Sequence, residues 1–121
     1  LSMALPKKNR LRLKKDFQDV KKNNLVFNTP LFGVSYMKVD SNQPLIGFVI
    51  SKKISTKAVE RNKLKRKLSE AVRSLLPQIN NNYKIIFLGK RELKEANFTD
   101  ISNQVESALK SIGVLSGTKP S

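Results

Sequence analysis

The chain has 121 residues, of which 39% are hydrophobic, a length and composition that suit a single domain with its own core. It contains 24 Lys+Arg and 9 Asp+Glu, so its formal net charge is +15, which predicts salt-sensitive association with nucleic acid or an anionic membrane. The absence of cysteine excludes a disulfide framework and a zinc knuckle, and the absence of histidine removes the commonest general base.

The N-terminal part is predicted to be a basic arm followed by a short helix. Residues 1–13 are polar and basic, with Pro6 disfavouring an early helix. A frayed tail without a specific role is the alternative for this arm, and residues 116–121 are expected to be a frayed tail. The cations expected to make this arm useful are Arg10, Arg12 and Lys14. The helix is expected from Asp16 to Lys22, where periodicity makes Phe17 more often a core residue than a platform for a base.

Two apolar segments follow, and they are predicted to be strands. Residues 31–39 are rich in β-branched and aromatic side chains, and residues 45–51 are almost continuously apolar as far as Ile50. A short polar loop joins them, which favours an antiparallel hairpin. Because residues 45–50 show no polar alternation, we expect this second strand to be central in the sheet and buried on both faces.

A long basic helix is predicted after these strands. Ser55 or Thr56 is the expected N-cap, and the helix is expected to end near Leu76, before Pro77. Its apolar positions recur at the spacing of one helical face, and they are Leu64, Leu68, Ala71, Val72 and Leu75.

The opposite face of this helix is strongly basic. Residues 57–73 contain seven cations and two anions, and Arg61 and Lys65 form a like-charge pair at i,i+4. Arg61 falls near the apolar stripe, whereas the remaining polar positions lie on the far side or flank it, and they are Asn62, Arg66, Arg73, Lys63, Lys67 and Lys65. The alternative is that this face is simply solvated. Solvated faces usually mix charge signs, so we favour a surface for a polyanionic partner.

The last part of the chain predicts a strand and a helix. The strand covers Tyr83 to Leu88 and is closed by Gly89. The helix begins at Asp100 and carries little net charge, so we expect it to brace the sheet with the apolar residues Ile101, Val105, Ala108, Leu109 and Ile112. The order helix, strand, strand, helix, strand, helix predicts an α+β fold, a two-layer sandwich whose strand–helix–strand unit is right-handed by default.

The residues indicate RNA binding rather than catalysis. No nucleotide-binding loop, metal-ligand spacing or nucleophile triad is present. Lys52 and Lys53 leave a strand just before the basic helix, so strand end, helix start and arm are expected to converge. Arginines at 61 and 66 can bind phosphate bidentately, and lysines at 63 and 65 act as point charges. Phe17 or Phe48 could stack with an unpaired base only if the ring lay beside an open cleft. For each ring, a place in the core is the favoured interpretation.

These residues resemble the protein subunit of bacterial ribonuclease P. The segment Ala58-x-x-Arg61-Asn62-Lys63-Leu64-Lys65-Arg66-x-Leu68 is similar to the signature helix of that family. Gly47 to Lys53 is similar to the strand that leads into it. Asn9-Arg10-Leu11-Arg12, then Asp16-Phe17-x-x-Val20, is similar to the family's opening, and Tyr83 to Leu88 with Lys90 agrees in place and type. The resemblance covers about residues 7–112.

The resemblance implies a fold, an activity and partners. The fold would be a two-layer α/β sandwich with a small mixed sheet and a left-handed βαβ crossover, in place of the default hand. The chain would assist a catalytic RNA, with one protein per RNA, in removing the 5′ leader of precursor tRNA. Mg²⁺ would be held mainly by the RNA, so no catalytic residue, tightly bound cofactor or small-molecule substrate is expected in this chain.

The resemblance also implies two groups of binding residues. Those expected to contact the RNA subunit, or to organise metal near it, are Arg61, Asn62, Lys63, Lys65, Arg66 and Arg73. Those expected to bind the leader of precursor tRNA are Phe17, Ser51, Lys52, Lys53 and Lys90. Three positions depart from the family pattern, because Lys63 replaces the commoner arginine, Ser69 stands where a cation is frequent, and Lys21 stands where an aromatic residue is frequent.

Two other functions fit the charge of the chain. A ribosomal or general structured-RNA-binding protein without a ribozyme partner would not distinguish precursor from mature tRNA. A module for anionic membranes is less favoured, because the apolar face of the basic helix lacks the Trp or Phe usual in interfacial helices. No apolar run has the length of a membrane span and no signal-peptide pattern opens the sequence, so we expect a cytoplasmic protein without a membrane partner.

Overall fold

A computed structural model describes residues 25–40 and 42–115. In chain order the elements are β1 (Val26–Asn28), β2 (Phe32–Lys38), β3 (Leu45–Val49), α2 (Ala58–Arg73), the 3₁₀ helix η2 (Leu76–Gln78), β4 (Tyr83–Gly89), the 3₁₀ helix η3 (Arg91–Glu95) and α3 (Phe98–Ile112). The predictions for the arm, for the helix at 16–22 and for residues 116–121 lie outside the described residues.

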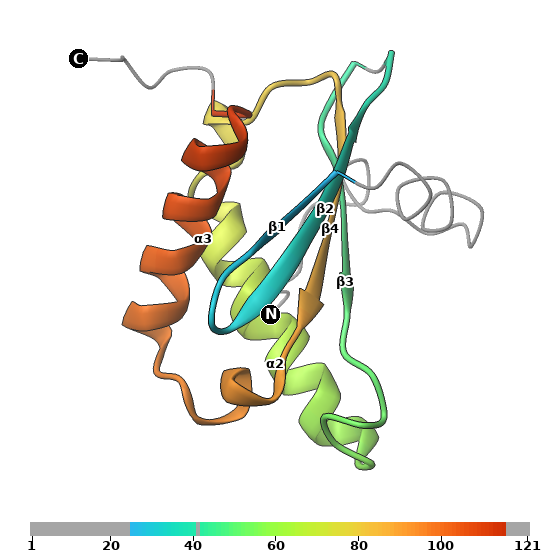
Figure 1. Cartoon of the computed structure of the whole chain (residues 1–121), viewed down its shortest axis with the longest axis vertical. Helices are drawn as coiled ribbons and strands as arrows, with labels where there is room; N and C mark the ends of the chain where they lie inside the picture. Colours follow the sequence, from blue (N-terminus) through green and yellow to red (C-terminus); the bar gives the residue numbers. More distant parts are fainter. Residues whose placement is uncertain (1–24, 41, 116–121) are drawn as a thin grey trace.

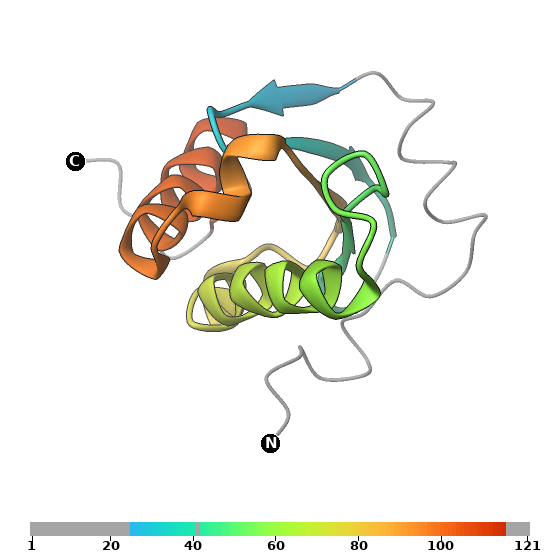
Figure 2. The same ribbon diagram turned by 90° about the horizontal axis from the view of Figure 1, so that it is seen from below.

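The described elements form two layers. A four-stranded sheet is one layer, and α2 and α3 lie side by side against the same face of it (Figures 1 and 2). The predicted α+β sandwich is therefore confirmed. Within the described residues, no helix is long and apolar enough to cross a membrane.

The strand order β1-β2-β4-β3 corrects two predictions. β2 pairs antiparallel with β4, starting from the pair Phe32 and Gly89, whereas β3 pairs parallel with β4, ending at the pair Val49 and Leu88. The predicted hairpin between residues 31–39 and 45–51 is wrong, because β4 lies between these two strands. The second strand, β3, is an edge strand rather than the central one.

β4 lies inside the sheet, and both of its faces are buried. Ile85 and Phe87 belong to the core under the helices, while Ile86 is fully buried in a smaller apolar cluster on the other face. β3 has half-buried residues at both ends, which an edge position tolerates. Both strands appear as apolar runs in the sequence, but β4 has seven residues and β3 has five, so β4 can pair along the whole length of β2.

The core follows the predicted helical periodicity. α2 buries Leu64, Leu68, Ala71 and Val72, and α3 buries Ile101, Val105, Ala108 and Leu109. On the sheet, Phe87 meets Phe32 edge-on and Phe48 in a stacked arrangement, each with ring centroids 5.4 Å apart. The ring of Phe48 is half-buried and packs against the core, in line with the interpretation favoured from the sequence, and it is already stacked on another side chain.

The ends of the helices differ from the prediction by a few residues. Lys57 is the N-cap position of α2 and makes no side-chain cap, so the expected cap by Ser55 or Thr56 is wrong. Ser55 is used differently, because its hydroxyl accepts from the backbone N–H of Lys57 two residues later. α2 ends at Arg73, and Pro77 lies in η2.

α3 begins slightly earlier than expected. Asn97 caps α3 by accepting from the backbone N–H of Asp100 at 2.8 Å, so the helix starts at Phe98.

The β3–α2–β4 unit has the expected pairing. β3 and β4 are parallel neighbours joined through α2, as the strand–helix–strand unit requires. The left hand of this crossover stays a prediction of the family resemblance. β1 was not expected, because three residues are too few to show an alternation.

Candidate nucleic-acid interface

A short turn carries the chain from β3 to α2. Its two ends are anchored, since Ile50 is 5% exposed and Ser55 is 7% exposed. The carbonyl of Ser51 accepts from the backbone N–H of Ile54 at 3.0 Å, which folds the turn back on itself. Ser51 and the two lysines that follow it are exposed. The buried ends therefore hold this turn while its cations face solvent.

A groove of about 630 Å³ lies between this turn, the start of α2 and η3. We call it the basic groove, and its lining residues are Lys52, Lys53, Ile54, Ser55, Thr56, Lys57, Val59, Glu60, Lys63 and Lys94. It contains five lysines and a single carboxylate. The predicted convergence of strand end and helix start is confirmed, while the arm lies outside the described residues.

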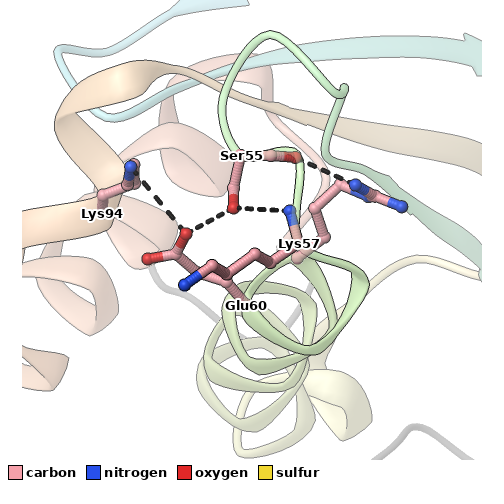
Figure 3. Close-up of polar contacts among 5 residues, drawn as sticks. Ser55, Lys57, Glu60 and Lys94 are labelled. Carbon is pink, nitrogen blue, oxygen red and sulfur yellow. Dashed lines mark hydrogen bonds and ion pairs between the residues drawn. The ribbon is translucent and has the colours of Figure 1, made fainter.

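Ser55 joins the turn to the first turns of α2 (Figure 3). Its hydroxyl donates to the carboxylate of Glu60 and accepts from the backbone N–H of Lys57 at 3.2 Å. Its carbonyl accepts from Nη1 of Arg61 at 2.9 Å. Arg61 is half-buried, which agrees with the position near the apolar stripe that the helical wheel predicted, and this bond fixes one side of its guanidinium group.

Glu60 is the carboxylate of the basic groove. The hydrogen bond from Ser55 lowers its pKa below the ordinary value of 4.5, the nearby positive charges of Lys94, Lys57 and Lys63 lower it further, and desolvation opposes them. Nζ of Lys94 lies 3.8 Å from Oε1 of Glu60, so the carboxylate also joins η3 to α2 (Figure 3).

This lowered pKa predicts a pH dependence of stability. Between the folded and the unfolded pKa of Glu60 the unfolded chain binds more protons, so the stabilisation is present above the ordinary value and is lost as pH falls through the folded value. We expect the Tm of Glu60→Gln, measured by circular dichroism, to fall less than that of the wild type between about pH 7 and pH 3. Parallel curves for the two proteins would contradict this role.

The exposed face of α2 carries the predicted polar residues. Asn62, Lys63, Arg66 and Arg73 are exposed, and we refer to these four as the exposed face of α2. Lys65 and Lys67 are half-buried beside it. Ser69 is buried, and its hydroxyl donates to the carbonyl of Lys65 at 2.9 Å, so it adds no polar group to this face. Arg73 is the last residue of α2 and lies far from the basic groove.

The structure separates Lys90 from the other predicted leader-binding residues. Its ammonium donates to the carbonyl of Thr29 at 2.8 Å, and its backbone N–H donates to the carbonyl of Leu31 at 2.9 Å. Lys90 therefore ties the end of β4 to the turn before β2 and does not line the basic groove. Lys52 and Lys53 do line it, Ser51 precedes them in the same turn, and Phe17 lies outside the described residues.

Sequence reasoning missed Lys94. This residue lies in η3, which is too short to show a helical pattern, and it stands between Glu92 and Glu95. The available signal was a group of cations after the last strand, namely Lys90, Arg91 and Lys94.

The arrangement of the whole basic groove suits anion binding, because five lysines and one carboxylate line it. Within residues 25–40 and 42–115, no group of three or more His, Cys, Asp or Glu side chains could hold a metal ion.

Comparison with known proteins relates this geometry to one family. The family model described as Ribonuclease P matches residues 5–113. A ribonuclease P protein component from Picosynechococcus sp. is 30% identical over 107 residues, which cover 88% of this chain and 92% of the relative. One from Pseudanabaena sp. is 31% identical over 115 residues, with 93% and 98% covered.

Solved structures show the same similarity. A Staphylococcus aureus RNase P protein, a mutant with defective mRNA degradation activity, has a TM-score of 0.82 and 27% identity, with 90% of this chain and 92% of that chain covered. The RNase P protein from Thermotoga maritima has a TM-score of 0.76 and 27% identity, with 84% and 96% covered.

Proposed function

Because this chain belongs to the ribonuclease P protein family and acts as a protein subunit of ribonuclease P in tRNA processing, we propose that the basic groove and the exposed face of α2 are its two RNA-binding surfaces. The observation that carries this proposal is the basic groove itself. Lys52 and Lys53 from the turn and Lys63 from α2 line one concave surface, where a single carboxylate opposes five cations. Such a surface suits a phosphate backbone.

The two surfaces have different partners in this proposal. The exposed face of α2, together with Arg61 and Lys65, binds the RNA subunit, where arginine forks can engage phosphates bidentately. Lys63 lies where this face meets the basic groove and belongs to both. The turn at 51–53 binds the single-stranded 5′ leader of precursor tRNA. Lysine contacts with phosphates do not identify bases, so this surface can accept leaders of different sequence.

The chemistry of hydrolysis is assigned in this proposal to the RNA subunit. Within the described residues, no group of three or more His, Cys, Asp or Glu side chains could hold a metal ion, and Glu60 already faces Ser55 and Lys94. We propose that Mg²⁺ is held by RNA, with one protein per RNA. The contribution of this chain is to hold the substrate in place. We propose that the complex works in the cytoplasm.

The experiment that tests this function compares two substrates. The protein is reconstituted with the ribonuclease P RNA of the same organism, and binding is measured for precursor tRNA with and without its 5′ leader. We expect the wild-type complex to prefer the leader-bearing tRNA and the variant Lys52→Gln/Lys53→Gln to lose most of that preference. The slope of log affinity against log salt should fall by roughly 0.7 for each lost phosphate contact.

The same measurement separates the alternative function. A wild-type complex that binds both tRNAs equally would contradict leader binding and favour a general structured-RNA-binding protein. Lys110→Gln is a suitable control for lost positive charge, because Lys110 lies in the last turn of α3 and does not line the basic groove. It should retain the preference for the leader-bearing tRNA.

A further inference from the structure

Lys94 reaches the basic groove from a part of the chain that the family resemblance did not assign to RNA binding. η3 follows the central strand, and it brings Lys94 to the carboxylate of Glu60 on α2 (Figure 3). The side chain of Lys94 is 39% exposed, and its Nζ lies 3.8 Å from Oε1 of Glu60. The ammonium is therefore held beside the groove while remaining accessible to solvent.

The ion pair with Glu60 leaves Lys94 able to bind another anion. The contact is long and exposed, and exposed ion pairs contribute little to stability. The hydroxyl of Ser55 donates to the same carboxylate oxygen, so Lys94 shares that oxygen with a second donor. An ammonium group has three N–H donors, and Glu60 can use only part of this capacity.

The charge and size of the groove indicate what that anion is. Its single carboxylate faces five lysines from three segments of the chain, so most of the positive charge in the groove has no counter-charge among the lining residues. Its volume of about 630 Å³ lies within the range of about 300–1,000 Å³ that is usual for small-molecule and cofactor sites, so it can hold a short piece of a nucleic-acid backbone. A segment of a phosphodiester backbone fits both properties.

We propose that Lys94 is a further RNA-binding residue, which contacts a backbone phosphate in the basic groove opposite the lysines of the turn. The proposal rests on the proposed function and extends the RNA-binding surface from α2 to η3. The ligand is an RNA phosphodiester, and its source is either the RNA subunit or the 5′ leader of precursor tRNA.

The test uses two variants that are matched in charge. Lys94→Gln and Lys110→Gln each remove one positive charge and one exposed ion pair, since Lys110 lies 3.5 Å from Glu106. The last turn of α3, where Lys110 lies, is at the opposite end of that helix from η3 (Figure 1). We expect Lys94→Gln to weaken RNA binding about tenfold and to reduce the salt slope by roughly 0.7–0.9. Lys110→Gln should have a much smaller effect, with similar Tm values for both variants.

Two binding measurements distinguish the sources of the phosphate. One uses the free protein with the ribonuclease P RNA, and the other uses the reconstituted complex with precursor tRNA with and without its leader. A loss in the first measurement assigns the phosphate to the RNA subunit, and a loss only with the leader-bearing tRNA assigns it to the leader. If Lys94→Gln behaves like Lys110→Gln in both, the proposal is wrong.

A third variant separates this inference from the proposed function. Arg66→Ala changes the exposed face of α2 and leaves η3 untouched. If Arg66→Ala weakens binding and Lys94→Gln does not, only the role of Lys94 fails. If neither variant weakens binding, the proposed role of the exposed face of α2 fails as well, while the leader-binding turn is tested by Lys52→Gln/Lys53→Gln.

Discussion

The Arg66→Ala variant is expected to bind the ribonuclease P RNA about ten- to a hundredfold more weakly than the wild type, with an unchanged Tm. Arg66 is exposed on α2, and within the described part of the chain no hydrogen bond or ion pair joins its side chain to another residue. Its removal therefore leaves the described fold intact. A bidentate contact with a phosphate would be lost entirely, because alanine offers neither charge nor donors.

Arg66→Lys separates the charge of this residue from its geometry. Lysine keeps the positive charge and loses the planar fork, so binding should be intermediate between the wild type and Arg66→Ala. Binding is measured by filter retention at several salt concentrations, and processing of precursor tRNA is measured at low magnesium. If Arg66→Ala assembled with the RNA and processed substrate like the wild type under these conditions, the role assigned to Arg66 would be wrong.

The largest effect on stability is expected for Phe87→Ala, which should lower the free energy of unfolding by about 3–5 kcal/mol. Phe87 is fully buried in β4 and contacts the rings of Phe32 and Phe48, each with centroids 5.4 Å apart. Alanine would leave a cavity at the place where the central strand meets β2 and β3. Such a loss is a large fraction of the free energy of unfolding of a typical domain, which is about 5–15 kcal/mol.

Phe98→Ala is the matched control for this change. Phe98 is the first residue of α3 and is 47% exposed, so its replacement should change the free energy of unfolding by less than about 1 kcal/mol. Both variants are measured by urea denaturation with the same optical signal. Equal midpoints for the two variants would show that the Phe87 cluster does not hold the sheet together.

Lys90 and Lys94 show why part of the site could not be predicted. Both are lysines in a short basic segment after β4, and the sequence alone offers no way to rank them. Folding places Thr29 next to Lys90 and Glu60 next to Lys94, although these partners are far away along the chain. A side-chain contact of this kind depends on which elements lie side by side in space. Lys90, assigned to the leader, bonds to a backbone carbonyl, and Lys94, which was missed, lines the basic groove.

The local sequence determined the longer helices and strands of the described residues and the basic face of α2. Leu64, Leu68 and Val72 recur at helical spacing, so the buried stripe and the cations opposite it follow from the geometry of a single helix. The apolar runs at 31–39 and 83–88 likewise predicted β2 and β4 within one residue at each end. These properties depend on residues that are close in the chain, and a pattern in the sequence records them directly.

Only the tertiary structure decided the strand order and the composition of the basic groove. Residues 45–50 and 83–88 are both apolar runs, so the sequence does not show which of the two strands lies inside the sheet. That depends on which strand pairs with β2, and in the structure β4 pairs with β2 on one side and with β3 on the other. The basic groove combines the turn after β3, the start of α2 and η3. These three segments meet because β3 and β4 are parallel neighbours, so their C-terminal ends lie at the same end of the sheet. Pairing between distant strands sets that meeting point, and periodicity within one segment carries no information about it.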